Sequence, residues 1–171
     1  MRKIAKASPL GLVGAAVALS WVVAGCQSQS GPTNASPSPT HTATAIDACS
    51  MLSPQDISAV LGVAVPGKST NTEPDMGNCS WENPATEESI SLEIGNPGTA
   101  RNNTLRPPEA GFPDPTTPGP DGMRLMGGGQ VEFAAGNRSN TVQVAMLKLS
   151  PDQANSAAID LARKITPKVP Q

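Results

Sequence analysis

Hydrophobic and polar positions alternate with a period of two in several parts of the chain. Between residues 89 and 95 every second side chain is apolar, which is the pattern of a strand with one buried face. Further strand-like stretches cover residues 77–83, 123–126, 130–135 and 140–149, of which the last is the longest. Glycine-containing turns separate the last three of them. The sequence therefore predicts an antiparallel sheet of about five strands.

Apolar residues recur at helical spacing on either side of this strand-rich region. Ser53 is placed to cap a short helix over residues 54–61, and Gly62 is placed to end it. A second helix begins after Ser150, where Gln153 completes the pattern of a capping box. Together the elements predict an α+β domain with a short N-terminal helix and a C-terminal helix packed on one face of the sheet.

Residues 96–122 interrupt the alternation with seven prolines and few apolar side chains. A segment of this length is too long for a tight turn, and such segments are usually either functional or disordered. Leu105 and Phe112 are the apolar residues that could dock it on the domain. We expect a Pro-rich loop here.

The first 26 residues differ from the rest of the chain. Three basic residues fall within the first six positions, residues 10–24 are apolar and uncharged, and Gly25 is followed by Cys26. A basic start and an apolar run of about 15 residues are typical of an export signal, because a membrane span needs about 20. The segment is therefore expected to direct export.

The residues around Cys26 also resemble the lipobox of bacterial lipoproteins. That resemblance implies cleavage after Gly25 and conversion of Cys26 to an N-acyl, S-diacylglyceryl cysteine. Each buried methylene contributes about 0.8 kcal/mol, so two or three acyl chains hold a protein firmly in a bilayer. The alternative is an ordinary secreted protein whose cysteine has no special role.

Residues 26–45 follow the signal and contain Ser, Thr, Pro, Ala, Gly, Gln and Asn almost exclusively. This composition cannot bury enough surface to offset the entropy lost on ordering, so it predicts a disordered tether. Its Thr, Ser and Pro content also resembles O-glycosylated stalks. The expected organisation is a signal peptide over 1–25, a lipidated N-terminus and tether over 26–45, and one α+β domain over 46–171.

Cys49 and Cys79 are the two cysteines left after Cys26 is assigned to lipid. An exported protein meets oxidising conditions, so an even pair predicts a structural disulfide. Two free thiols or a redox pair are the alternatives, although the Cys-x-x-Cys spacing of redox sites is absent. Trp81 follows Cys79 at a spacing of two, which places both side chains on one face of a strand.

The composition of the chain limits which partners, catalytic groups and metal sites are expected. Removing the three basic residues of the signal leaves 9 basic against 14 acidic residues, a net charge of −5, and no basic stripe, so nucleic acid is not an expected partner. The single histidine, His41, lies in the tether, which argues against His-dependent catalysis in the domain. Acidic residues cluster loosely at Glu73/Asp75, Glu87/Glu88 and Asp114/Asp121. They have no calcium-loop spacing, and we interpret them as a solvated surface. We therefore expect no metal and no cofactor.

Two cysteine segments carry a wider resemblance. Cys49 and Leu52 before the first helix, with Cys79 and Trp81 on a strand, resemble a family of small actinobacterial lipoproteins of unknown function. The resemblance implies a disulfide and a location in the cell envelope, but no chemistry. The Pro-rich segment departs from that pattern.

The expected function is that of an exported, membrane-anchored lipoprotein on the extracytoplasmic face of the cell membrane. It would act as a non-catalytic ligand-binding or interaction module, using one face of the sheet or the Pro-rich loop. The alternative is a structural or accessory component of an envelope protein assembly, and an enzyme is the least favoured reading. The expected partners are the membrane, through the anchor, and an unidentified small molecule or envelope protein.

Overall fold

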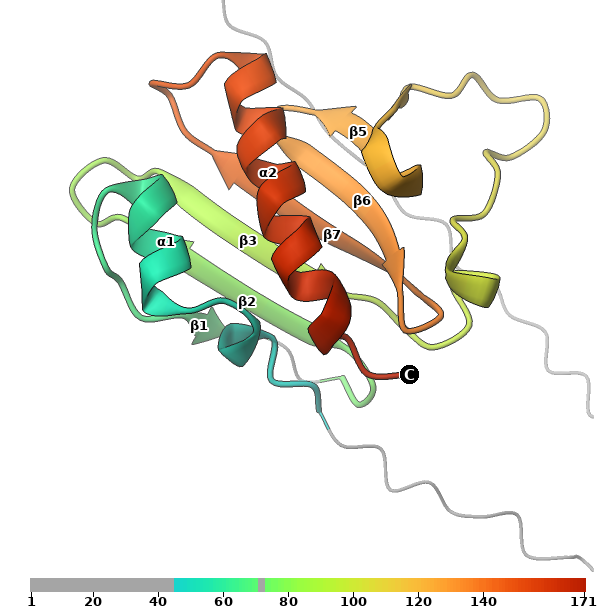
Figure 1. Ribbon diagram of the computed structural model, residues 1–171, viewed down its shortest axis with the longest axis horizontal. Coiled ribbons are helices and arrows are strands. Elements are labelled where there is room, and N and C mark those ends of the chain that lie inside the picture. Colours follow the sequence, from blue (N-terminus) through green and yellow to red (C-terminus); the bar gives the residue numbers. More distant parts are fainter. Residues whose placement is uncertain (1–44, 71–72) are drawn as a thin grey trace, which may run out of the picture. The chain divides into compact units, whose positions relative to one another are not determined.

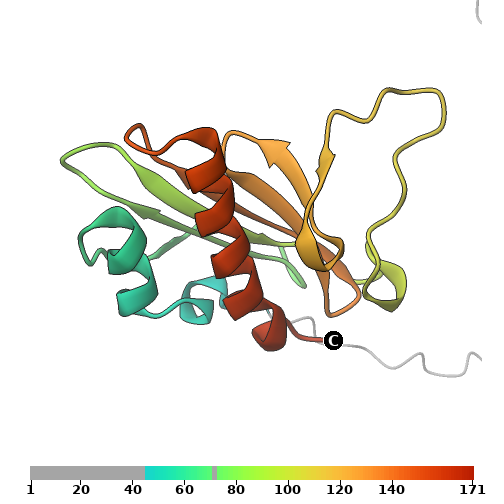
Figure 2. The ribbon, with the colours of Figure 1, turned by 45° about the horizontal axis from the view of Figure 1, so that its top comes forward.

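The computed structural model describes residues 45–70 and 73–171. The chain forms one antiparallel sheet with two α-helices on the same face (Figures 1 and 2). The helices are α1 (Pro54–Leu61) and α2 (Pro151–Ile165). The strands are β1 (Lys68–Ser69), β2 (Gly77–Glu82), β3 (Ser89–Ile94), β4 (Thr117–Pro118), β5 (Arg124–Gly127), β6 (Gln130–Ala135) and β7 (Arg138–Ala145). Four short 3-10 helices complete the fold: η1 (Ala48–Met51), η2 (Arg101–Asn103), η3 (Pro120–Gly122) and η4 (Thr166–Lys168).

The sheet has seven strands, in the order β1-β2-β3-β7-β6-β5-β4, and every neighbouring pair is antiparallel. The sequence-based expectation of about five strands was therefore too low. The five expected strands are all present, and the two that were missed, β1 and β4, have only two residues each at the sheet edges. Two residues are too few to show an alternation. The last strand also starts and ends earlier than expected, since β7 covers 138–145 and not 140–149.

Local signals for both helices are confirmed. Ser53 caps α1 in a capping box with Asp56, and Gly62 ends it in the left-handed conformation with φ 73°. Ser150 and Gln153 form the corresponding capping box of α2. Both helices thus begin where serine replaces the missing backbone acceptors of a first turn.

The core lies between the helices and the sheet. Ile90, Leu92 and Ile94 of β3 are buried, whereas the alternating Ser91 and Glu93 face the other side. α2 packs on β6 and β7, and α1 lies against β3. The buried face of α2 consists of small and aliphatic residues: Ala154, Ala158, Leu161, Ala162 and Ile165. Small alanines let α2 approach the sheet closely enough to exclude water from this aliphatic core.

The Pro-rich segment 96–122 is only partly a loop. Its first part is docked on the β6–β7 turn, where Ala100 is fully buried and its N–H donates to the carbonyl of Asn137 at 3.1 Å. Asn103 and Asn137 exchange side-chain hydrogen bonds with each other's backbone N–H groups. The last part forms β4 and η3. Leu105 is buried and docks the segment as expected, but Phe112 is 67% exposed and does not.

Candidate functional site

The predicted lipidation site lies outside the described residues. Gly25, Cys26, the whole tether up to residue 44 and His41 are all in that part of the chain. Cleavage after Gly25 and lipidation of Cys26 therefore remain predictions. The described residues begin at Ala45, four positions before Cys49.

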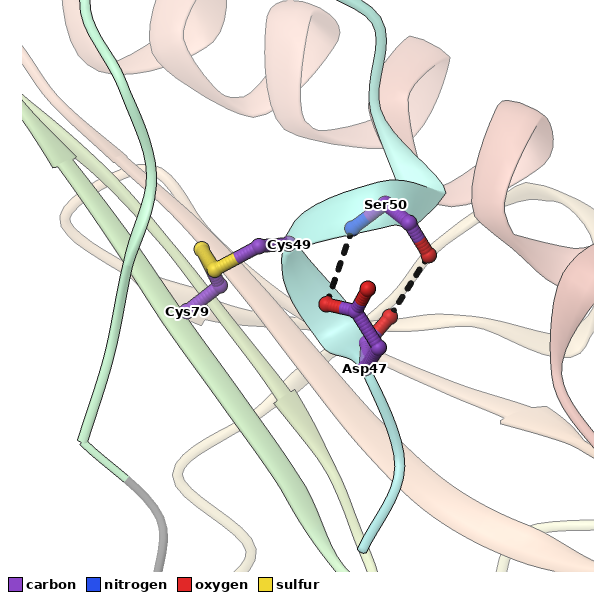
Figure 3. Close-up of a disulfide and its surroundings, with 4 residues drawn as sticks. All are labelled: Asp47, Cys49, Ser50 and Cys79. Atoms are coloured by element: carbon purple, nitrogen blue, oxygen red, sulfur yellow. Dashed lines mark hydrogen bonds between the residues drawn. A yellow bond between two sulfur atoms is a disulfide. The ribbon is translucent and has the colours of Figure 1, made fainter.

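The structure contains the expected disulfide between Cys49 and Cys79 (Figure 3). Cys49 lies in η1, which Asp47 caps by accepting a hydrogen bond from the Ser50 backbone N–H at 3.3 Å. Cys79 is buried on β2, and the two Cα atoms are 5.1 Å apart. The bond therefore fastens the segment that enters the domain to a strand of the sheet, 30 residues further along the chain.

Trp81 lies beside this disulfide, as its spacing from Cys79 predicted. Both side chains are buried, and Gly67 fits against them. A Cβ atom at Gly67 would lie 2.6 Å from the Cys79 Sγ and 2.7 Å from the Trp81 Nε1. The glycine is needed because no side chain fits in that space. This group of residues is part of the packed interior and has no room for a substrate.

The face of the sheet opposite the helices is polar over its central strands. We call it the open face and define it by two rows of residues that lie opposite one another in neighbouring strands. The first row runs through Ser80, Ser91, Gln143 and Gln130. The second row runs through Asn78, Glu93, Thr141, Glu132 and Arg124. Every member can donate or accept hydrogen bonds through its side chain.

The open face contains a hollow of about 350 Å³. Residues of both rows line it, together with Thr70 after β1. The depth follows from side-chain size, because the short Ser80 and Ser91 lie at one end of the first row and are followed by the longer Gln143 and Gln130. The hollow is thus a shallow depression of the right size for a small polar molecule.

One end of the open face is held by Arg124. Its guanidinium donates to Glu132 Oε2 at 3.3 Å and also to the carbonyl of Arg106 in the Pro-rich segment. Glu132 in turn accepts a hydrogen bond from the Ser139 hydroxyl at 2.5 Å. The negative charge of Glu132 is therefore balanced by Arg124, whereas the side chain of Glu93 near the centre of the face is exposed. The open face as a whole offers hydrogen bonds with a small excess of negative charge.

Two carboxyl groups elsewhere have shifted pKa values. The hydrogen bond from Lys164 on α2, with those from Ser53, lowers the pKa of Asp56 to about 2. Hydrogen bonds from the Thr116 hydroxyl and backbone N–H lower the pKa of Asp114. A carboxylate with a lowered pKa is a weak base and a poor proton donor near neutral pH. These two groups hold structure together and do not favour acid–base catalysis.

Among the residues that the structure describes, three polar side chains are buried without any sequence signal that could have revealed them: Arg138, Asn140 and Glu88. Arg138 donates to the carbonyls of Asp75, Gly95 and Pro170, which joins two loops to the C-terminal segment. Asn140 is fully buried and donates to three carbonyls of the β6–β7 hairpin.

Glu88 corrects an expectation, because it was placed with the acidic residues of a solvated surface. It is only 6% exposed and lies 3.7 Å from the Lys148 ammonium. Its side chain also accepts a hydrogen bond from Thr86, so it fastens the β2–β3 turn.

In residues 45–70 and 73–171, no group of three or more His, Cys, Asp or Glu side chains is arranged to hold a metal ion. Within the same residues, no helix combines the length and the apolar character needed to cross a membrane. Comparison of the chain with protein-family models, curated proteins and solved structures finds no match. The arrangement of the residues is therefore the sole basis for a function.

Proposed function

We propose that the protein is a lipid-anchored, non-catalytic binding module of the cell envelope, and that the open face of its sheet holds a small polar ligand. The observation that carries the proposal is the hollow of about 350 Å³ lined by hydrogen-bonding side chains from β2, β3, β6 and β7. The apolar core lies behind these four strands. A rigid sheet positions such side chains with little entropy left to lose on binding.

The chemistry of the open face selects among ligands. Hydroxyl and amide groups from Ser80, Ser91, Thr141 and Gln143 match a ligand rich in hydroxyl or amide groups. The exposed carboxylate of Glu93 adds a preference for a neutral or cationic ligand over an anionic one. A saccharide, an amino sugar or a short peptide fits this description.

The open face is tested by titrating the isotope-labelled protein with named probes and following backbone amide signals by NMR. The panel consists of a neutral disaccharide, glucosamine and a cationic tripeptide. We expect one probe class to shift amides of β2, β3 and β7, and Ser91→Trp to abolish the shift by filling the hollow. Ser156→Trp, on an exposed position of α2, is the matched control and should bind normally. Shifts confined to other elements, or no shift with any probe, would refute the site.

The anchor belongs to the same proposal. The three-part signal and the position of Cys26 directly after Gly25 support cleavage there and lipidation of the new N-terminus. Residues 26–45 would then separate the binding module from the bilayer. With a net charge of −5 after cleavage, the module is repelled weakly by anionic lipids and stands away from the surface.

Replacement of Cys26 with Ser tests the anchor. We expect the variant to lack the mass of the acyl chains and to remain an uncleaved precursor, because the resemblance to a lipobox implies that lipid is added to Cys26 before the cut after Gly25. Cys49→Ser serves as a control, since it removes a different cysteine and should leave membrane association unchanged. A Cys26→Ser protein that is still cleaved before residue 26 and still sediments with membranes would overturn lipidation.

The alternative role is that of a structural or accessory component of an envelope protein assembly. One observation favours it, namely the exposed Phe112 in the Pro-rich segment. An isolated large apolar side chain on a protruding segment is a typical anchor for a protein partner.

A further inference from the structure

The middle of the Pro-rich segment, residues 107–116, forms an arc that stands clear of the helices and the sheet (Figures 1 and 2). Residues 106–115 are exposed without interruption. Four prolines, at positions 107, 108, 113 and 115, restrict its backbone. The arc thus projects from the domain with fewer accessible conformations than an ordinary loop of the same length.

Both ends of the arc are attached to the domain. At the first end Leu105 is buried, the Arg106 guanidinium donates to the Gly98 carbonyl at 2.9 Å, and the Arg106 carbonyl accepts from Arg124. At the other end Thr117 and Pro118 form β4 and pair with β5. A segment fixed at both ends loses less entropy when a partner binds it.

Phe112 has a defined position in the arc. Its N–H donates to the carbonyl of Glu109 at 3.2 Å, which closes a turn, and Gly111 has the positive φ of 90° that the third residue of a type II turn adopts. Pro113 follows and confines Phe112 to extended backbone. The turn and the proline therefore restrict the backbone at a phenylalanine whose side chain is 67% exposed.

Charge in the arc has a single sign. Glu109 and Asp114 flank Phe112, and residues 107–116 contain no Lys, Arg or His. The Asp114 carboxylate is oriented by hydrogen bonds from the Thr116 N–H and hydroxyl at 2.9 and 2.6 Å, which also lower its pKa and keep it ionised. Two carboxylates within three residues of Phe112 in the sequence oppose insertion into a membrane with anionic lipids. They complement basic side chains on a protein instead.

We propose that the arc is a docking element that inserts Phe112 into an apolar pocket with a basic rim on a protein partner. The inference deepens the alternative role as a component of an assembly and is independent of ligand binding on the open face. Phenylalanine is among the residues enriched in the cores of protein–protein interfaces, whereas leucine is under-represented among interface hot spots. This distinguishes Phe112 from Leu147, which is 94% exposed in the turn after β7.

Site-specific photo-crosslinking in the full-length chain, in its native envelope, tests the proposal. Phe112 and, in a separate protein, Leu147 are replaced with benzoylphenylalanine. We expect a discrete protein adduct at position 112, none at 147, and loss of the adduct when Glu109→Lys and Asp114→Lys are introduced together. An adduct that survives this charge reversal, an adduct with lipid only, a dimer of this chain or no adduct would each overturn the proposal.

Binding of the cross-linked partner, once purified, supplies the quantitative test. Phe112→Ala should raise the Kd at least about tenfold, as truncation of an aromatic hot spot does. Phe112→Tyr should recover most of the affinity, and Leu147→Ala should leave the Kd unchanged. Ser91→Trp should also leave it unchanged, which separates this surface from the open face. Equal Kd values for Phe112→Ala and the native chain would refute the anchoring role of the ring.

Discussion

The contact between α1 and α2 should make the stability of the domain depend on pH through Asp56. The Asp56 Oδ2 accepts hydrogen bonds from the Ser53 N–H at 3.0 Å and hydroxyl at 2.7 Å, and Lys164 of α2 donates to Oδ1. These contacts lower the pKa of Asp56 from 3.8 to about 2. The carboxylate therefore stabilises the start of α1 and its attachment to α2 at the same time.

The size of this stabilisation follows from the two pKa values. One pKa unit corresponds to about 1.4 kcal/mol, so the lowering from 3.8 to about 2 sets an upper bound of about 2.5 kcal/mol. The Lys164 side chain is 52% exposed, and water screens an ion pair of this kind. We therefore expect Asp56→Ala to reduce the free energy of unfolding by about 1 to 2 kcal/mol at pH 7, including the lost helix cap.

The pH range is fixed by the direction of the pKa change. Because the pKa of Asp56 is lower in the folded than in the unfolded protein, its stabilisation is complete above about pH 5 and disappears as the pH falls through about 2. Urea unfolding at pH 7, 5, 3 and 2 should show the difference between Asp56→Ala and the native chain shrinking at acid pH. Urea is preferred to guanidinium because it adds no salt.

Two further variants make the result decisive. Lys164→Met should lose a similar part of the stability with the same pH trend, because it removes the largest cause of the lowered pKa. Asp152→Ala removes an exposed carboxylate from the first turn of α2 and should change the free energy of unfolding by less than about 0.5 kcal/mol. An Asp56→Ala difference that is independent of pH, or no larger than the Asp152→Ala control, would refute this reasoning.

Two other predictions concern the backbone and the disulfide. Gly129→Ala should lower the Tm by several degrees more than Gly128→Ala, since both glycines have positive φ but only a Cβ at Gly129 would lie 2.3 Å from the Val144 carbonyl oxygen. Equal Tm values for the two would contradict this. Replacing both Cys49 and Cys79 with Ala should lower the free energy of unfolding by about 3 to 4 kcal/mol, the loop-closure value for a separation of 30 residues. Dithiothreitol should lower the Tm of the native chain but not that of the double variant. A double variant as stable as the oxidised native chain would contradict the estimate.

The helices and the main strands could be predicted from the sequence because their signals are local. Serine caps, proline in a first turn and Gly62 fix where α1 begins and ends within ten residues of chain. The alternation in β3 likewise assigns Leu92 to the core and Ser91 to the other face. Such patterns act through neighbouring residues, so they need no knowledge of the rest of the fold.

The Pro-rich segment makes contacts that its local sequence did not predict. Its prolines predicted a loop, yet Ala100 is buried and Thr117 and Pro118 join the sheet. Ala100 is buried by the β6–β7 turn, and β4 exists because β5 leaves its edge open for pairing. Asn137 is distant from Ala100 in the sequence, so that contact could not be foreseen. The pairing of β4 with β5 is local, but the two residues of β4 are too few to show an alternation.

The sequence by itself determined the period of the long elements and the two capping boxes. It predicted the pairing of Cys49 with Cys79, which the structure confirms, and an export signal before Cys26, which stays a prediction. The tertiary structure alone decided the order of the strands, the burial of Arg138 and the hollow on the open face. The physical reason is distance along the chain. Strand β3 pairs with β7 across more than 40 residues, and Ser80, Ser91 and Gln143 become neighbours only because backbone hydrogen bonds set that register.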